Sequence, residues 1–371
     1  MPTFKTVEQL ITGTGSFEQL GESAAALGKR ALIVTGRNAM RKAGVTDRAC
    51  GLLGAAGVEA RLFEEIAGEP TSAEADAGRA LCREEHCDLV IGIGGGSAMD
   101  AAKAIAALVN AEAPAAEYVE GRSADADVAL PCIEVPTTSG TGTEVTPNAV
   151  LTVSGKPIKK SIRGVGLLPR VALVDPELAA TCPPSVTAAS GMDALTQAIE
   201  SYVSIKATPL TEALSLGAAR LLLESLPRAV ENGKDLAARE TCSYGSVMAG
   251  MALANARLGV VHGVAHPLGV RYHIPHGLCC GVLLPASIRL NREAAAAKYA
   301  MLSHVSGGDI ESVVERMLDR FGIPSTLAEY DIGESDFTTI AAESMPSGSL
   351  KANPKKVTED DVIGILKQVA G

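Results

Sequence analysis

Residues 88–103 read DLVIGIGGGSAMDAAK, where an apolar run passes through consecutive glycines into an alanine-rich segment. The run at 88–93 predicts a buried strand, the glycines predict a tight turn, and residues 97–109 predict a helix. Glycines let the backbone approach an anion closely, and the first N–H groups of a helix attract phosphate. The stretch therefore favours a nucleotide-binding unit. A plain tight turn fits equally well, because Ser97 and Asp100 match a capping box at the start of the helix.

The alternation of strand and helix continues on both sides of this unit. Short apolar runs predict strands at 31–35, 59–63, 132–135 and 171–174, helices at 41–56 and 72–86, and a hairpin at 148–153 and 159–163. Such alternation indicates a parallel sheet with helices on both faces. After Pro183 and Pro184 the segments become Ala/Leu-rich with helical periodicity, at 186–204, 209–231, 236–258 and 261–268. We expect an α/β domain over residues 1–180 and an all-α domain over 181–371.

A second loop of small and hydroxyl residues follows the predicted strand at 132–135. This loop, residues 136–144, reads PTTSGTGTE, and its hydroxyls suit a diphosphate and a ribose, although such residues also favour ordinary solvent loops. The first strand ends at Gly36 and Arg37, where NAD-binding folds carry a carboxylate for the ribose hydroxyls. A cation in that place suits the 2′-phosphate of NADP, or is an exposed turn arginine.

The helical half holds a pattern of metal-ligand residue types. Asp193 and Gln197 lie four residues apart, as do His262 and His266, and His273 and His276 follow closely. Such spacing puts each pair on one helix face. Two histidines and one carboxylate, drawn from Asp193, His262 and His276, suit Fe²⁺ or Zn²⁺ with a position open for a substrate oxygen. A single pair at this spacing is often only packed side chains, whereas four of the six histidines within 262–276 favour a site.

Composition excludes several classes of protein. The formal net charge is −10 and the pI about 5.2, so the chain repels nucleic-acid phosphates and anionic membranes. The eight cysteines contain no C-x-x-C pair, which gives no support to a zinc finger or a thioredoxin-like motif. The start lacks the pattern of a signal peptide, and no stretch approaches about 18 apolar residues. We expect a reduced, soluble, cytoplasmic protein that binds a small molecule.

Taken together, these motifs resemble the iron-containing, or group III, alcohol dehydrogenases over nearly the whole chain. The resemblance is carried by residues 94–103, 136–144, 191–195, 262–277 and by Asn353-Pro354-Lys355. It implies a Rossmann-like domain followed by an all-helical domain, as in dehydroquinate synthase, and a homodimer or a larger homo-oligomer. It also implies a divalent metal, Fe²⁺ or Zn²⁺, on Asp193, Gln197, His262 and His276, with His266 and His273 as proton-relay candidates. The dinucleotide contacts that it implies are Gly95, Gly96, Ser97, Asp100, Thr137, Thr138, Thr141 and Lys160.

The sequence departs from the family pattern at residue 197, where Gln replaces the usual His, and at Lys355, where Arg is usual. An amide oxygen is a weaker ligand than imidazole for Fe²⁺ or Zn²⁺. The metal is then bound more loosely, is a different ion, or rests on three protein ligands. Catalysis without a metal, with His266 or His273 as general acid, is a further alternative.

The expected activity is that of an NAD(P)-linked alcohol dehydrogenase that works mainly as an aldehyde reductase on short-chain substrates, with NADP slightly favoured. In related proteins the segments that hold Arg257, Arg271 and Lys351 border the substrate region, so the resemblance suggests a cationic rim for an aldehyde with an anionic tail. The alternative is that these are surface or inter-subunit residues. Three alternatives stay open: a polyol dehydrogenase of the glycerol type, a lyase similar to dehydroquinate synthase, and a non-enzymatic nucleotide-binding protein whose metal site has decayed.

Overall fold

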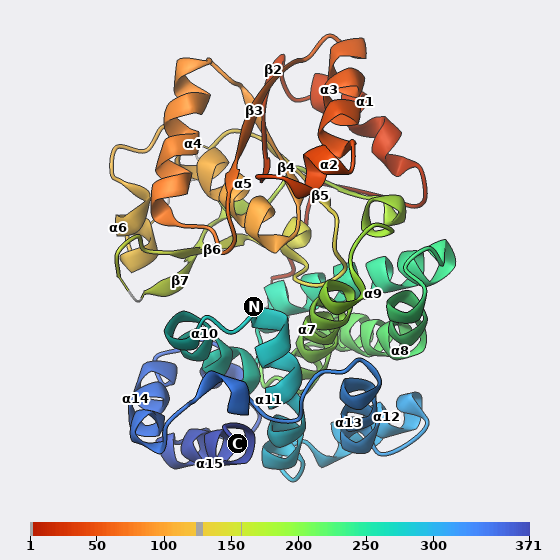
Figure 1. Cartoon of the computed structure of the whole chain (residues 1–371), viewed down its shortest axis with the longest axis vertical. Coiled ribbons are helices and arrows are strands. Elements are labelled where there is room, and N and C mark those ends of the chain that lie inside the picture. Colours follow the sequence, from red (N-terminus) through yellow and green to blue (C-terminus); the bar gives the residue numbers. More distant parts are fainter. Residues whose placement is uncertain (1–2, 124–128, 157) are drawn as a thin grey trace. The chain divides into compact units, whose positions relative to one another are not determined.

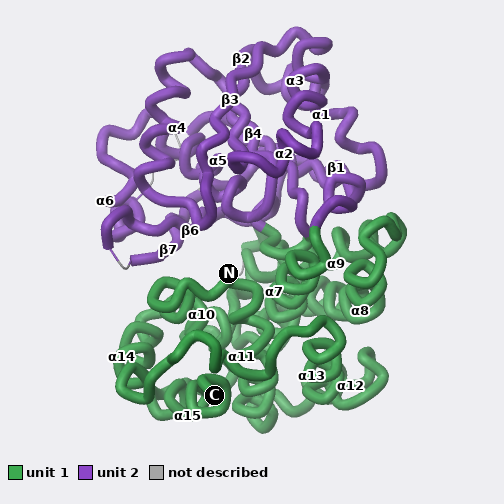
Figure 2. The backbone as a smooth tube through the Cα atoms, in the orientation of Figure 1, with its two compact units in different colours: residues 1–5, 139–142, 183–371 green, residues 6–138, 143–182 purple. Residues whose placement is uncertain are grey.

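The computed structural model describes residues 3–123, 129–156 and 158–371. The chain forms two compact units (Figure 2). One, which we call the α/β unit, comprises residues 6–138 and 143–182. The other, the helical unit, comprises residues 3–5, 139–142 and 183–371. The short segment 139–142 therefore belongs by its packing to the helical unit, although it interrupts the α/β unit in sequence.

A six-stranded parallel sheet, part of which is labelled in Figure 1, forms the centre of the α/β unit. Its strand order is β1-β8-β5-β4-β2-β3. The strands are β1 (Gln9–Thr12), β2 (Arg30–Gly36), β3 (Glu59–Ile66), β4 (Leu89–Gly94), β5 (Cys132–Pro136) and β8 (Val171–Val174). Alternate residues of each strand face opposite sides of a sheet. Ile33, Ile91 and Ile133 accordingly pack in one apolar cluster, and Leu32 and Val90 pack in another. The predicted parallel sheet with helices on both faces is confirmed.

The helices of the α/β unit are α1 (Leu20–Ala25), α2 (Ala39–Lys42), α3 (Val45–Ala55), α4 (Ser72–Glu84), α5 (Gly96–Leu108) and α6 (Ala115–Glu120). Helices α1 and α3 contribute to the first apolar cluster, and α4 and α5 contribute to the second. Strands β6 (Asn148–Thr152) and β7 (Lys159–Arg163) form the predicted hairpin as a separate antiparallel pair. Short 3₁₀ segments occupy Ser16–Gln19, Thr143–Val145, Val165–Leu167 and Pro176–Ala179.

Two local predictions in this unit are wrong. The helix expected at 41–56 is divided into α2 and α3, because Gly44 between them has a left-handed backbone with φ 73°. The capping box expected at Ser97 and Asp100 does not form: Gly95 is the N-cap of α5, and no side chain caps that helix. The carboxylate of Asp100 bonds to other segments instead, as described below.

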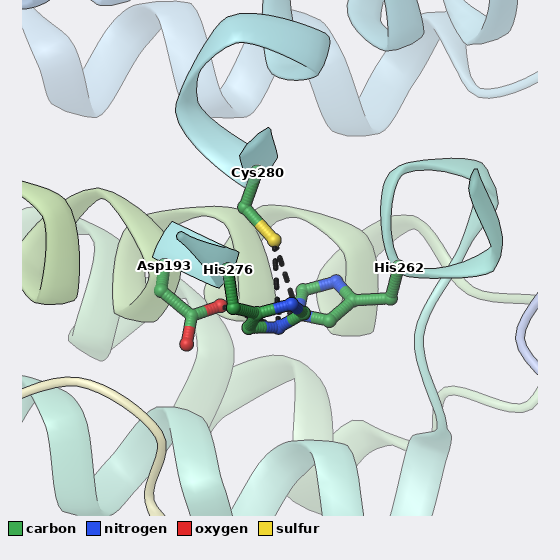
Figure 3. A group of neighbouring side chains, drawn as sticks. All are labelled: Asp193, His262, His276 and Cys280. Atoms are coloured by element: carbon green, nitrogen blue, oxygen red, sulfur yellow. Dashed lines mark hydrogen bonds and ion pairs between the residues drawn. The ribbon is translucent and has the colours of Figure 1, made fainter. Parts of the chain in front are cut away.

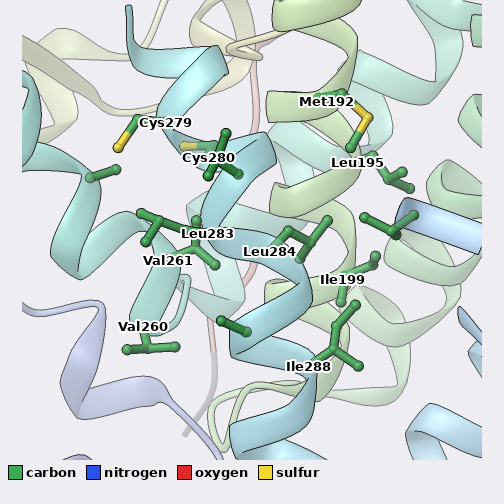
Figure 4. Packing of buried hydrophobic residues seen from close by; sticks show 14 of the residues in the cluster. Met192, Leu195, Ile199, Val260, Val261, Cys279, Cys280, Leu283, Leu284 and Ile288 are labelled. Atoms are coloured by element: carbon green, nitrogen blue, oxygen red, sulfur yellow. The ribbon is translucent and has the colours of Figure 1, made fainter. Parts of the chain in front are cut away.

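The helical unit contains α7 (Pro184–Val203), α8 (Pro209–Glu231), α9 (Leu236–Ala256), α10 (Val260–Tyr272), α11 (His276–Asn291), α12 (Ala296–Ser306), α13 (Ile310–Arg320), α14 (Glu334–Ser344) and α15 (Glu359–Val369), with 3₁₀ turns at Ala328–Tyr330 and Leu350–Ala352. Leu195 and Ile199 of α7 and Leu284 and Ile288 of α11 share one apolar core (Figure 4). The predicted all-helical domain is confirmed. In the described part of the chain no single helix is long and apolar enough to cross a membrane; α9 and α10 meet that criterion only as a pair bent by 100°.

Candidate metal centre and nucleotide-binding loops

Four side chains from three helices converge inside the helical unit. Asp193 comes from α7, His262 from α10, and His276 and Cys280 from α11, and each offers one ligand atom within 4.8 Å of all the others. Figure 3 shows these side chains pointing toward one another. Oδ1 of Asp193 lies 3.1 Å from Nε2 of His262 and 3.8 Å from Nε2 of His276. The structure thus brings together Asp193, His262 and His276 and adds a cysteine, while Gln197, the fourth residue proposed as a ligand, lies beside them.

The helices place these groups by simple spacing. Asp193, Gln197 and Glu200 follow one another at four and three residues along α7, so they share one face of that helix. His276 is the first residue of α11, and Cys280 lies one turn further on the same face. His262 belongs to the first turn of α10. Three helix segments with fixed backbones therefore supply the cluster, and none of its members lies on a loop.

Glu200 holds the imidazole of His262 from the side away from the cluster. Its Oε2 lies 2.7 Å from Nδ1 of His262, and its Oε1 accepts a hydrogen bond of 2.7 Å from the backbone N–H of Val261. A carboxylate that accepts the Nδ1 proton leaves Nε2 free to bind a metal, an arrangement typical of metal-ligating histidines. Glu200 was not among the site residues predicted from the sequence. Its position seven residues after Asp193 places it on the same face of α7, but only the fold brings that face to His262.

The N-terminus of α10 is held by residues distant in sequence. Gly259 is its N-cap, and no side chain of its own segment caps it. Instead Oδ1 of Asn353 accepts a hydrogen bond of 3.1 Å from the N–H of Val260, beside the bond that Glu200 accepts. A Cβ at Gly259 would lie 2.8 Å from both acceptor oxygens. The Asn353-Pro354-Lys355 motif is therefore linked to the candidate site through the start of α10.

The electrostatics of the cluster favour a cation. Burial alone would raise the pKa of the Asp193 carboxyl, but the charge of His276 and hydrogen bonds from His262 and Gln197 bring that pKa down to about 2. Burial also disfavours a charged His262, yet Cys280 and the carboxylates of Asp193 and Glu200 hold the pKa of its imidazole well above the usual value. Burial raises the pKa of the Cys280 thiol to about 12. Two buried carboxylates thus attract positive charge to this point.

Gln197 is buried beside the cluster with an unpaired oxygen. The side-chain amide of Gln197 donates an N–H to the carboxylate of Asp193, because a carboxylate can only accept. Its Oε1 has no hydrogen-bond partner among the described residues. An unpaired buried oxygen is unfavourable and is satisfied by a cation or by water. Oxygen, imidazole and sulfur donors at these separations suit Zn²⁺ or Fe²⁺, so the residues present fit a metal.

The two other predicted histidines differ in position. The ring of His266 is half-buried, and its centroid lies 5.6 Å from that of His276. His273 is exposed at the C-terminus of α10, where its backbone is left-handed with φ 55°. The structure therefore places His266 against the cluster and His273 at the surface. His86 and His304 are exposed.

The glycine-rich turn and the start of the second loop lie together in the α/β unit. They follow the neighbouring strands β4 and β5, where Gly94 is paired with Pro136, and the N–H of Thr137 donates to the carbonyl of Gly94 at 2.9 Å. A Cβ at Gly95 would lie 3.6 Å from Oγ1 of Thr138. Because no side chain caps α5, the N–H groups of Gly96 and Ser97 in its first turn face no capping oxygen. This is a suitable place for a phosphate.

Two buried charges fix the segment that follows this turn. Asp100 accepts hydrogen bonds from Oγ1 of Thr143 at 3.2 Å and from the N–H of Val150 at 3.1 Å. Nζ of Lys103 is fully buried and donates to the carbonyls of Thr143, at 2.8 Å, and Asn148. Both side chains come from α5, so the helix that begins at the glycine-rich turn also positions the second loop and the hairpin.

The remaining predicted nucleotide contacts belong to other segments. Gly36 ends β2, and the exposed Arg37 after it donates from Nε to the carbonyl of Glu65 at 3.2 Å. Lys160 is exposed on β7. Thr141 is partly exposed in the segment 139–142, which packs with the helical unit.

Both units match known proteins. Residues 8–176 match the family model of iron-containing alcohol dehydrogenases, and residues 187–370 match the model of the C-terminal part of the same family. The NAD-dependent methanol dehydrogenase of Bacillus methanolicus is 34% identical over 370 residues, which cover 96% of this chain and 97% of that protein.

Solved structures agree with these matches. A crystal structure of a 1,3-propanediol oxidoreductase has a TM-score of 0.96 and 35% identity, with 99% of each chain covered. The sulfoacetaldehyde reductase of Bifidobacterium kashiwanohense, solved with NAD⁺, has a TM-score of 0.91 and 30% identity, with 100% of this chain and 99% of that chain covered. The resemblance predicted from the sequence is confirmed, and the chain belongs to the iron-containing alcohol dehydrogenase family.

Proposed function

We propose that this alcohol dehydrogenase works mainly as an NAD(P)H-linked, metal-dependent reductase of short-chain aldehydes. In this proposal residues 1–180 bind the dinucleotide and residues 181–371 bind the metal and the substrate. The observation that carries it is the cluster of the buried Asp193 and His262 with the half-buried His276, and with Glu200 behind His262. Burying charged groups without a partner is strongly unfavourable, so this arrangement favours a working cation site over a decayed one.

The proposed ligands are Asp193, Gln197, His262 and His276. When bound there, Fe²⁺ or Zn²⁺ supplies a Lewis acid that polarises the substrate carbonyl, while the dinucleotide supplies the hydride. Glu200 sets the tautomer and orientation of His262. Reduction of an aldehyde also consumes one proton. We assign its delivery to His266, beside His276, and the exchange with solvent to the exposed His273.

We assign the dinucleotide to the turn before α5 and to the loop after β5. Free N–H groups at Gly96 and Ser97 suit the diphosphate, and Thr137 and Thr138 lie beside them. The proposed set also includes Gly95, Asp100, Thr141 and Lys160, with Gly36 and Arg37 for the adenosine ribose. An exposed arginine after β2 favours the 2′-phosphate of NADP.

We further propose an aldehyde with an anionic tail, held by Arg257 and Lys351. Both are exposed, and Arg257 has φ 65° and ψ −176°, a conformation that is costly outside glycine and typical of functional positions. Arg271 is excluded from this role because Glu343 pairs with its guanidinium at 2.6 Å. The name of the related sulfoacetaldehyde reductase is in keeping with such a substrate.

The test is steady-state oxidation of NADPH and NADH with neutral and anionic short aldehydes, and with glycerol in the reverse direction. Each assay is run on the purified protein as isolated, after chelation, and after addition of Fe²⁺ or Zn²⁺. We expect turnover that falls on chelation and returns with one ion. His262→Ala should abolish this response, whereas His304→Ala, at an exposed histidine outside the cluster, should keep it. Turnover that is indifferent to metal would overturn the metal-dependent mechanism, and preferential glycerol oxidation would replace the aldehyde reductase with a polyol dehydrogenase.

A further inference from the structure

Cys280 lies among the proposed metal ligands. Its Sγ is 3.6 Å from Nε2 of His276 and 3.9 Å from Nε2 of His262, and it is buried (Figure 3). We propose that Cys280 is a protein ligand of the metal, in the coordination position for which Gln197 offers only a weak amide oxygen. The inference rests on the metal-dependent function proposed above and concerns which atoms of this chain hold the ion.

The separations within the cluster are close to those of a tetrahedral site. Zinc binds sulfur at about 2.3 Å and nitrogen or oxygen at about 2.0–2.1 Å. In a tetrahedron these bond lengths give S···N edges of roughly 3.6 Å and N···O edges of roughly 3.3 Å. Sγ of Cys280 already lies 3.6 Å from one histidine nitrogen, and Oδ1 of Asp193 lies 3.1 and 3.8 Å from the two. A single ion can therefore be reached by all four atoms with small side-chain adjustments.

The chemistry of the donors points the same way. A thiolate is a far stronger ligand for a borderline-soft ion than a neutral amide oxygen. On binding, the Cys280 thiol releases its proton to solvent, as metal-ligating cysteines do. One thiolate and one carboxylate then balance the two charges of the ion. Two neutral imidazoles complete the protein ligands, and a fifth position is left for the substrate oxygen. Because thiolate ligands favour Zn²⁺ over Fe²⁺, we infer that this chain prefers zinc.

A buried cysteine is often only a small apolar residue of the core, and the adjacent Cys279 offers a comparison. Both sulfurs belong to fully buried residues of the apolar core (Figure 4). Cys280, however, lies four residues after His276 and shares its helix face, whereas Cys279 is rotated by about 100° from it. Among the described residues, Cys280 is the cysteine whose sulfur lies within the ligand cluster of Asp193, His262 and His276.

The test is X-ray absorption spectroscopy at the zinc edge on the full chain loaded with one equivalent of Zn²⁺. We expect one sulfur scatterer at about 2.3 Å together with nitrogen and oxygen at about 2.0–2.1 Å. Cys280→Ser should lose the sulfur scatterer, and Cys279→Ser should keep it. The wild-type spectrum decides the question even if a variant fails to fold.

A second readout compares the ions directly. The Co²⁺-loaded wild type should show a sulfur-to-cobalt charge-transfer band in the near ultraviolet that Cys280→Ser lacks. Competition titrations should show at least a tenfold loss of Zn²⁺ affinity in Cys280→Ser, with a smaller loss for Fe²⁺. An ion bound with nitrogen and oxygen ligands only would overturn the role of Cys280 and leave the proposed function standing. Failure of the wild type to bind any of the three ions would overturn both.

Discussion

Glu200 contacts His262 through one carboxylate oxygen, at 2.7 Å from Nδ1, while its other oxygen accepts the N–H of Val261 at 2.7 Å. One side chain of α7 thus both orients a proposed metal ligand and satisfies a free N–H at the start of α10. The position of α10 and the direction of its histidine are consequently set by the same group. This coupling makes Glu200 a positioning residue that never needs to touch the ion.

Glu200→Gln should therefore lower metal affinity by roughly 10–100-fold, the usual effect of losing such a partner. Glutamine can still accept from Val261 but offers no second carboxylate oxygen to the Nδ1 proton. The measurement is a competition titration against a chelator, with circular dichroism to check that helix content is retained. An unchanged affinity in a folded variant would show that His262 needs no such support.

Asp193→Asn should remove the bound ion and lower kcat/KM at least 100-fold, which corresponds to about 2.7 kcal/mol of transition-state stabilisation. The substitution keeps size and burial but removes the charge that His276 and His262 stabilise. Metal analysis of the purified protein and steady-state rates check this expectation. Asp319→Asn, at an exposed aspartate of α13, is the matched control. Full metal content in Asp193→Asn would contradict the proposed ligand set.

Lys103→Met should destabilise the protein by roughly 3 kcal/mol, because it leaves buried acceptors in the second loop and the hairpin without their donor. Denaturant unfolding measures the change, and Lys42→Met, at an exposed lysine of α2, is the control. The metal content of the folded variant should stay the same, since Lys103 belongs to the other unit. A variant as stable as the wild type would mean that water replaces the ammonium group at no cost.

Glu144→Gln should change how stability depends on pH. Burial raises the pKa of the Glu144 carboxyl from 4.5 to about 7, although its own backbone N–H and Lys103 oppose this rise. Because the folded pKa is the higher one, the carboxyl stabilises the fold fully below pH 4.5, and this contribution is lost as the pH rises through 7. Wild-type stability should therefore fall relative to Glu144→Gln by on the order of 3 kcal/mol across that range. Thermal melts at pH 4.5 and pH 8 test this, and parallel curves would contradict it.

Arg37→Ala should raise the KM for NADPH roughly tenfold, as expected for the loss of about 1.4 kcal/mol from one charge-assisted contact. The KM for NADH should not change, because NADH has no 2′-phosphate. An unchanged KM for NADH in the same variant also shows that the variant is folded. Equal effects on both would assign Arg37 a structural role through its bond to the carbonyl of Glu65.

Local patterns predicted most of the fold. The run at 88–93 and the glycines after it predicted the buried strand β4 and the turn that follows it, and α8 begins at Pro209 and ends at Glu231 as its periodicity predicts. Strand β1 was missed because it has only four residues and one buried side chain, so its sequence carries no alternation to detect. Its pairing with β8 decides its conformation, and that partner is distant in sequence.

In the candidate site, too, some residues were predicted from the sequence and others were not. Residue type, the clustering of four histidines within 262–276 and the family resemblance together singled out Asp193, His262 and His276. Glu200 and Cys280 escaped because a buried glutamate or cysteine acquires its role from helices that meet only in three dimensions. The i, i+4 relation of His276 and Cys280 is visible in the sequence, but it becomes informative only once His276 is known to face Asp193.

The hydrogen bond from the N–H of Val260 to Asn353 also affects the order in which the helical unit assembles during synthesis. A ribosome releases Glu200, His262 and Cys280 well before Asn353, so the nascent chain holds the full set of donors while the N–H of Val260 still has no partner. Until residue 353 emerges, the carboxylate of Glu200 is the long-range side-chain acceptor available to the first turn of α10. We therefore expect the start of α10, and with it the direction of His262, to become fully fixed only when the C-terminal part of the chain has been made.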